Sequence, residues 1–169
     1  MPAAPSATAF GRALVLAASL AGCSGYSVAT SPSAPAHDAF QRAPMSSGQV
    51  CVFRPASIGA ALTTPVRDNG VVVGATQGPS YFCYLAGPGT HGLSVEVSDA
   101  RPLRLWVDAG HRYFVEHQIN VGEDRLVPVH EARARELLQS CDYATVVGAP
   151  KGQPLPPTVP LVAGLLVAP

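Results

Sequence analysis

Short runs of alternating apolar and polar residues, separated by turn-forming residues, fill the chain from residue 48 to residue 148. In "LSVEVS", Leu93, Val95 and Val97 fall on one side of an extended chain, and the serines and the glutamate fall on the other. A period of two is typical of a β-strand with one buried face. The pattern therefore predicts an all-β domain over residues 48–148.

Further strands are expected in "QVCVFRP", which Pro55 ends, in "SYFCYL" and in "RLVPV". Asn69-Gly70 precedes the valine run of "VVVGAT", and this pair adopts positive φ at little cost, so it predicts a hairpin turn. The stretch "PLRLWVDAGHRYFVEHQI" holds two alternating runs joined by Asp108-Ala109-Gly110, which we interpret as a second hairpin.

One helix is expected, in "HEARARELLQS", where Glu131 lies in the first turn. Several short strands and one late helix predict a small antiparallel β-sandwich with one C-terminal helix, flanked by flexible tails. The Ser- and Pro-rich residues 23–47 read as a flexible tether, and residues 149–169 form a Pro-rich apolar tail. That tail is expected either to be flexible or to pack on the domain and add an edge strand.

The first 22 residues resemble a lipoprotein signal peptide, in which Arg12 precedes an apolar run from Ala13 to Ala21. This run is too short for a helix that crosses about 30 Å of hydrocarbon. It ends in Leu20-Ala21-Gly22-Cys23, which resembles the lipobox of bacterial lipoproteins. The resemblance implies cleavage before Cys23, lipidation of its thiol and acylation of its amino group. The alternative is an ordinary secreted protein in which Cys23 is a free thiol.

In lipoproteins of this kind, an Asp after the lipidated cysteine is the usual signal for retention in the inner membrane. Ser24 stands at that position, so the resemblance favours the outer membrane, with the domain facing the periplasm.

Charge excludes some classes of partner. Eleven Lys and Arg balance eleven Asp and Glu, and no basic stripe is present, so nucleic acid is not an expected partner. The chain has no phosphate-binding glycine loop and its cysteines lack metal-ligand spacing, so no cofactor and no metal are expected.

In an oxidising periplasm, two of Cys51, Cys83 and Cys141 are expected to form a disulfide. Three pairings remain open, and Cys51 with Cys83 is slightly favoured because it would join two early strands.

Several short motifs resemble the proteobacterial lipoproteins grouped as domain of unknown function 2846. The resemblance covers Gln49 to Tyr143, implies a small β-sandwich displayed from a membrane, and brings no established activity with it. The three cysteines and the apolar tail lie outside the family's pattern. The motifs are Arg54-Pro55, Gly70, Ser80-Tyr81-Phe82, Pro88-Gly89-Thr90-His91, and Gly110 with Tyr113-Phe114-Val115.

Candidate chemistry is sparse. His111 and His117 would lie about 20 Å apart on one strand, too far to share a metal ion. His91 is expected to bond to backbone in its turn, and the other histidines and the single acids such as Glu116 are expected to be solvated. No nucleophile has a recognisable base or oxyanion hole, so we expect no enzymatic activity.

Three residues are candidates for binding a partner. Arg54, at a strand end before Pro55, could clamp a carboxylate or a row of carbonyls, or it could be a buried structural residue that holds a loop. Trp106 and Arg104 share the outward parity of their strand, so Trp106 is either an exposed anchor or covered by a second sheet. We expect an envelope lipoprotein whose domain is a binding or structural module for an envelope protein or a cell-wall component. The alternative is a periplasmic hydrolase or another enzyme.

Overall fold

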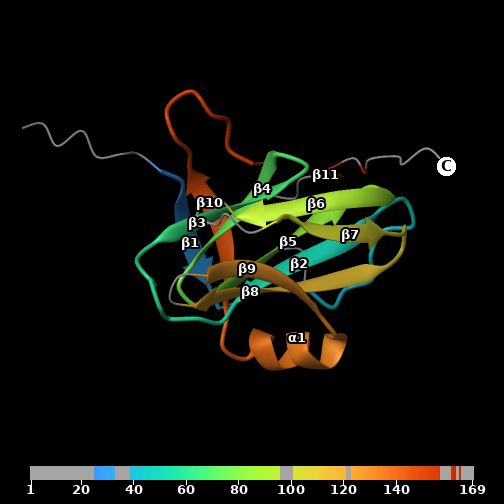
Figure 1. Ribbon diagram of the computed structural model, residues 1–169, viewed down its shortest axis with the longest axis horizontal. Coiled ribbons are helices and arrows are strands. Elements are labelled where there is room, and N and C mark those ends of the chain that lie inside the picture. The colour runs from blue at the N-terminus through green and yellow to red at the C-terminus, as the bar shows by residue number, and fades with distance from the viewer. Residues whose placement is uncertain are drawn as a thin grey trace, which may run out of the picture.

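The computed structural model describes residues 25–32, 39–95, 101–120, 123–156, 161–162 and 164. Within these residues two β-sheets pack face to face, and one short helix covers the outer side of the larger sheet (Figure 1). The expected all-β sandwich is confirmed. In chain order the elements are β1 (Ser27–Ser31), β2 (Gly48–Arg54), β3 (Thr63–Asp68), β4 (Val71–Gln77), β5 (Ser80–Ala86), β6 (Gly89–Val95), β7 (Leu103–Val107), β8 (Arg112–Asn120), β9 (Glu123–Val129), α1 (Glu131–Leu138), β10 (Asp142–Gly148) and β11 (Leu161–Val162).

The larger sheet has the order β1-β10-β5-β2-β8-β9, and β11 also pairs with β5. The smaller sheet has the order β4-β3-β6-β7. Most neighbours are antiparallel, but β2 pairs with β8 in parallel, and both β10 and β11 pair with β5 in parallel. Parallel pairs need long connections, which the chain supplies by passing through the smaller sheet between β2 and β8.

Strand β2 lies at the centre of the larger sheet and is buried along its whole length. Val50 and Val52 belong to the core between the two sheets, whereas Cys51 and Phe53 belong to a second core beneath α1. Burial on both faces explains why the sequence "VCVF" is apolar without alternation.

The hairpin turn predicted at Asn69-Gly70 is confirmed. Both residues have positive φ, 49° and 82°, and they join β3 to β4. Along β4, Gly74 lies against the ring of Phe82, and a Cβ at Gly74 would lie 2.4 Å from that ring. The smaller sheet can approach β5 here only because this position has no side chain.

The second predicted hairpin is wrong. Gly110 does have positive φ, at 77°, but β7 pairs with β6 in the smaller sheet and β8 pairs with β2 and β9 in the larger one. The turn 108–110 therefore carries the chain from one sheet to the other. Two consecutive alternating runs look the same in sequence whether or not they pair with each other.

Part of the segment expected to be a tether is ordered. Residues 27–31 form β1, which pairs with β10, and Ala39 and Ala43 are buried. Phe40 packs on Phe114, with 5.3 Å between ring centroids, and the Arg135 guanidinium of α1 lies 4.2 Å from its ring. These contacts join residues 39–43 to the helix side of the larger sheet.

The apolar tail follows the packing alternative at residues 161–162. Leu161 and Val162 pair with Leu85 and Ala86 of β5, and Val162 is buried in the core between the sheets. Its carbonyl also accepts a hydrogen bond from Gly87 N–H at 2.6 Å.

Cys51 and Cys83 face each other across the antiparallel pair β2–β5, with 4.1 Å between their Cα atoms, and form a disulfide. This is the pair that the sequence slightly favoured. Cys141 is a buried free thiol, and burial raises its pKa to about 11. It is therefore protonated and unreactive in the folded protein at neutral pH.

We expect denatured, non-reduced mature protein to expose one thiol that reacts with a maleimide, and Cys141→Ser to remove it. Replacing both Cys51 and Cys83 by alanine should lower the free energy of unfolding by about 2 to 4 kcal/mol, because the cross-link restricts the unfolded chain. Mass spectrometry after labelling and urea unfolding measure the two effects. Three labelled thiols in the wild-type domain would contradict the pairing.

Candidate functional site

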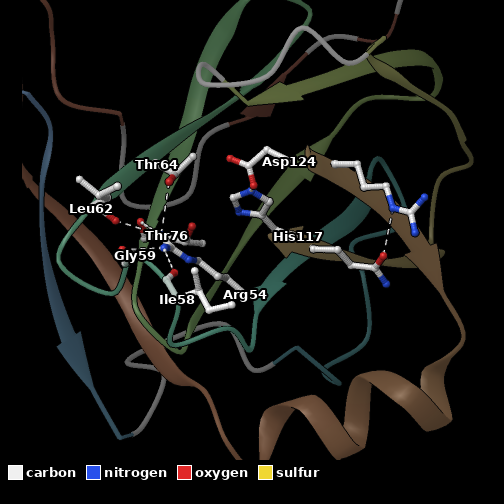
Figure 2. A network of polar contacts seen from close by, with 10 residues as sticks. Arg54, Ile58, Gly59, Leu62, Thr64, Thr76, His117 and Asp124 are labelled. Atoms are coloured by element: carbon white, nitrogen blue, oxygen red, sulfur yellow. Dashed lines mark hydrogen bonds and ion pairs between the residues drawn. The ribbon is translucent and has the colours of Figure 1, made fainter. Parts of the chain in front are cut away.

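The Arg54 side chain holds the connection between β2 and β3. Its Nη2 donates to the carbonyls of Ile58 and Gly59 at 3.2 and 2.9 Å, and its Nη1 donates to the carbonyl of Leu62 at 2.9 Å (Figure 2). Three backbone carbonyls of the loop 55–62 thus accept hydrogen bonds from one guanidinium. The planar fork of arginine suits this arrangement because its donors diverge at fixed angles.

The same guanidinium joins the two sheets. Nη1 lies 3.3 Å from Thr64 Oγ1 of β3 and 3.4 Å from the carbonyl of Thr76 of β4, whereas Arg54 itself ends β2 in the larger sheet. Arg54 is only 1% exposed. Its interpretation as a partner-binding residue is therefore wrong, and the alternative, a buried arginine that holds a loop, describes its contacts.

His117 and Asp124 lie beside Arg54 (Figure 2). His117 Nε2 is 3.1 Å from Asp124 Oδ1, and the imidazole is fully buried, contrary to the expectation that it is solvated. Burial lowers the pKa of His117, the Arg54 charge adds to this effect, and Asp124 opposes it. Burial also lowers the pKa of Arg54, and the Asp124 carboxylate opposes that shift.

A second buried polar group lies between β3, β5 and β6. The Asp68 Oδ2 atom accepts a hydrogen bond from Tyr84 OH at 2.8 Å and lies 2.6 Å from His91 Nδ1. The other ring nitrogen of His91, Nε2, lies 2.8 Å from the Gly87 carbonyl, so the expected backbone contact is present. Burial raises the pKa of Asp68, and the hydrogen bonds from Tyr84 and His91 oppose that shift.

The Asp68-His91 pair resembles two members of a catalytic triad, but the contacts assign it a packing role. Asp68, Tyr84 and His91 are all buried, and both ring nitrogens of His91 already have partners. A nucleophile would need a free imidazole nitrogen within hydrogen-bond reach. Among the described residues, no group of three or more His, Cys, Asp or Glu side chains could hold a metal ion.

Trp106 lies on the outer face of the smaller sheet and is 56% exposed. Leu103, Leu105 and Val107 turn toward the core, while Arg104 and Trp106 turn to solvent, as the alternation predicted. The indole Nε1 donates to Asp108 Oδ1 at 2.9 Å. The indole is thus oriented by a hydrogen bond while most of its apolar surface remains open.

Tyr113 also forms hydrogen bonds with Asp108. Its hydroxyl donates to Asp108 Oδ2 at 3.4 Å and accepts from the Asp108 backbone N–H at 2.9 Å. Partial burial raises the pKa of Tyr113. Asp108 follows β7 and Tyr113 belongs to β8, so contacts from both sheets hold the acceptor of the Trp106 hydrogen bond.

Sequence reasoning missed the buried polar pairs. Glu116, expected to be solvated, is almost buried, and its carboxylate lies 3.3 Å from Arg133 Nη2 of α1. Asp124 is the register partner of Ile119, two residues from His117 on the same face of β8. The His117 and Asp124 side chains thus meet diagonally across the β8–β9 pair, which no local pattern reveals. Cys23, the residue of the proposed lipid anchor, lies outside the described residues.

Comparisons with protein-family profiles, curated proteins and solved structures find no match to this chain. The resemblance to the family of unknown function therefore stays a prediction. In the part of the chain that the structure describes, no helix is long and apolar enough to cross a membrane.

Arg54→Met should lower the free energy of unfolding by at least about 2 kcal/mol, because it leaves acceptors in the loop 55–62 and in the smaller sheet without a donor. Arg104→Met is the matched control: the same change on the exposed face should stay within about 0.5 kcal/mol of wild type. Urea unfolding followed by circular dichroism measures both variants. Equal effects of the two substitutions would contradict the role of Arg54.

Proposed function

We propose that this protein is a lipid-anchored component of the cell envelope whose β-sandwich binds an envelope protein or a cell-wall component. The lipobox at Leu20-Ala21-Gly22-Cys23 supports the anchor, and Ser24 after the cysteine supports an outer-membrane location with the domain facing the periplasm. The disulfide Cys51–Cys83 agrees with an oxidising compartment.

The observation that carries the binding role is the exposed, oriented indole of Trp106. Large aromatic side chains dominate binding energy at interfaces, and less of that energy is spent on ordering when the ring is already held. Asp108 and Tyr113 hold it here, and Arg104 adds a cation on the same face.

A binding role also fits the interior polar groups better than catalysis does. The buried Asp68, His91 and Tyr84 side chains bond to one another, and Arg54 bonds to the chain's own carbonyls. These groups stabilise the sandwich, and the candidate surface for a second molecule is the outer face at Trp106.

The anchor is tested by intact mass and fractionation. Wild-type protein extracted from membranes should carry the mass of the acyl groups on a chain that begins at Cys23, and Cys23→Ser should leave the membrane fraction after a high-salt wash. Cys141→Ser is the control, because it removes a thiol from the domain and should stay with the membrane. A Cys23→Ser protein that remains there after the wash would contradict the anchor.

The binding surface is tested by crosslinking in intact envelopes followed by affinity capture. Trp106→Ala should reduce the captured partner at least about tenfold, the effect of losing an interface residue worth more than 1.4 kcal/mol. Ile58→Ala is the matched control, because Ile58 is 58% exposed in the loop 55–62 rather than on β7 and should leave capture unchanged. Equal capture by wild type and Trp106→Ala would overturn this assignment.

A further inference from the structure

The described residues begin close in sequence to Cys23, the proposed lipid anchor. Tyr26 is buried, and its hydroxyl donates to Gln153 Oε1 at 2.5 Å. Cys23 precedes Tyr26 by three residues, and three residues of fully extended chain reach at most about 11 Å. A lipid carried by Cys23 would therefore enter a bilayer close to the Tyr26 end of the domain.

An apolar groove lies beside Tyr26. Its volume is about 190 Å³, and its lining includes Tyr26, Val71 at the start of β4 and Leu155 in the segment after β10. Val71 and Leu155 are both more than half exposed, although each is a large apolar side chain. Val147 of β10 is also exposed, and the pairing of β1 with β10 places it opposite the start of β1.

The one charged residue that lines this groove is basic. Arg67 is among the lining residues, and none of the lining residues is acidic. Lys151, the only lysine in the chain, is exposed on the turn closed by the hydrogen bond from Gln153 N–H to the Pro150 carbonyl. Since Gln153 also bonds to Tyr26, this cation is held near the groove.

We propose that the groove formed by Tyr26, Val71 and Leu155 is the membrane-facing side of the domain and lies against phospholipid. The proposal rests on the lipid anchor of the proposed function. Exposed apolar side chains gain from entering the boundary between headgroups and acyl chains, and lysine and arginine beside them fit phosphate groups. A bilayer is the favoured occupant because a two-residue link between Tyr26 and Cys23 keeps the groove near the membrane surface.

The proposed anchor point lies far from the Trp106 surface along the molecule. Strand β1 lies at one end of the long axis of the molecule, and the turn between β7 and β8 lies at the other (Figure 1). Trp106 is the penultimate residue of β7. The proposed anchor point beside β1 and the Trp106 end of β7 thus lie toward opposite ends of the molecule.

The test uses the lipidated full chain in vesicles of phosphatidylethanolamine and phosphatidylglycerol. Leu155→Cys, which replaces a side chain that is 51% exposed, carries an environment-sensitive fluorophore; the native Cys141 is buried and Cys51–Cys83 is closed. Met45→Cys is the control, since Met45 is exposed and lies beside Gly110 in the turn between β7 and β8. Unchanged melting temperatures establish that both labelled proteins are folded.

We expect the probe at residue 155 to brighten at least twofold when the protein binds vesicles, and to be quenched by nitroxide-bearing lipids. On the same vesicles, the probe at residue 45 should keep the fluorescence intensity that it has in aqueous solution. Equal quenching of both probes by aqueous iodide, with the protein still bound to vesicles, would overturn the membrane-facing groove and leave the anchor intact. A chain without acyl mass would overturn both. Protection of residue 155 only when other envelope proteins are added would replace lipid by a protein occupant and also overturn the proposal.

Discussion

The buried guanidinium of Arg54 is the interaction on which one end of the sandwich depends. It is contributed by the central strand of the larger sheet, it donates to Thr64 and Thr76 in the smaller sheet, and it fixes the loop that joins the sheets. Removing a charge from water costs several kcal/mol, so this arrangement is stable only because nearly all of the donors find acceptors. The nearby Asp124 carboxylate of β9 partly compensates the positive charge of Arg54, so β9 also contributes to this interaction. Arg54 thus helps to set the distance between the two sheets at this end and the shape of the loop 55–62.

Local pattern predicted the strands but not how they pair. Alternation and the Asn69-Gly70 turn depend on a few neighbouring residues, and these features are present as expected. The parallel pair β2–β8 and the passage from β7 to β8 between sheets depend on contacts far apart in the sequence. Strand β1, with the sequence "SVATS", has no apolar alternation because it lies at the edge of its sheet and is mostly exposed. Its pairing with β10 is therefore invisible in the sequence.

The candidate surface at Trp106 was only partly predictable, because local pattern shows which residues share a face but not what covers that face. Parity alone placed Arg104 and Trp106 on one face of β7, but whether another layer covers that face is a property of the whole fold. Parity also holds in β8, where His117 faces the same way as Val115 and Glu116 faces α1, but the expectation that these polar side chains are solvated was wrong. In a strand with both faces covered, polar residues are not a sign of solvent. They indicate instead that a partner such as Asp124 or Arg133 has to be present.

The proposed short link to the membrane would have consequences that a long tether would not have. A flexible tether of residues 23–47 would have an r.m.s. end-to-end distance of about 28 Å and would leave the orientation of the domain free. Because Tyr26 is already part of the packed structure, only two residues separate it from Cys23, and rotation of a lipid-anchored domain would be restricted. A partner that binds Trp106 would then have to meet the domain within about one domain length of the bilayer. Restricting both position and orientation raises the effective concentration of such a partner without any additional contact, provided that it is also confined to the envelope.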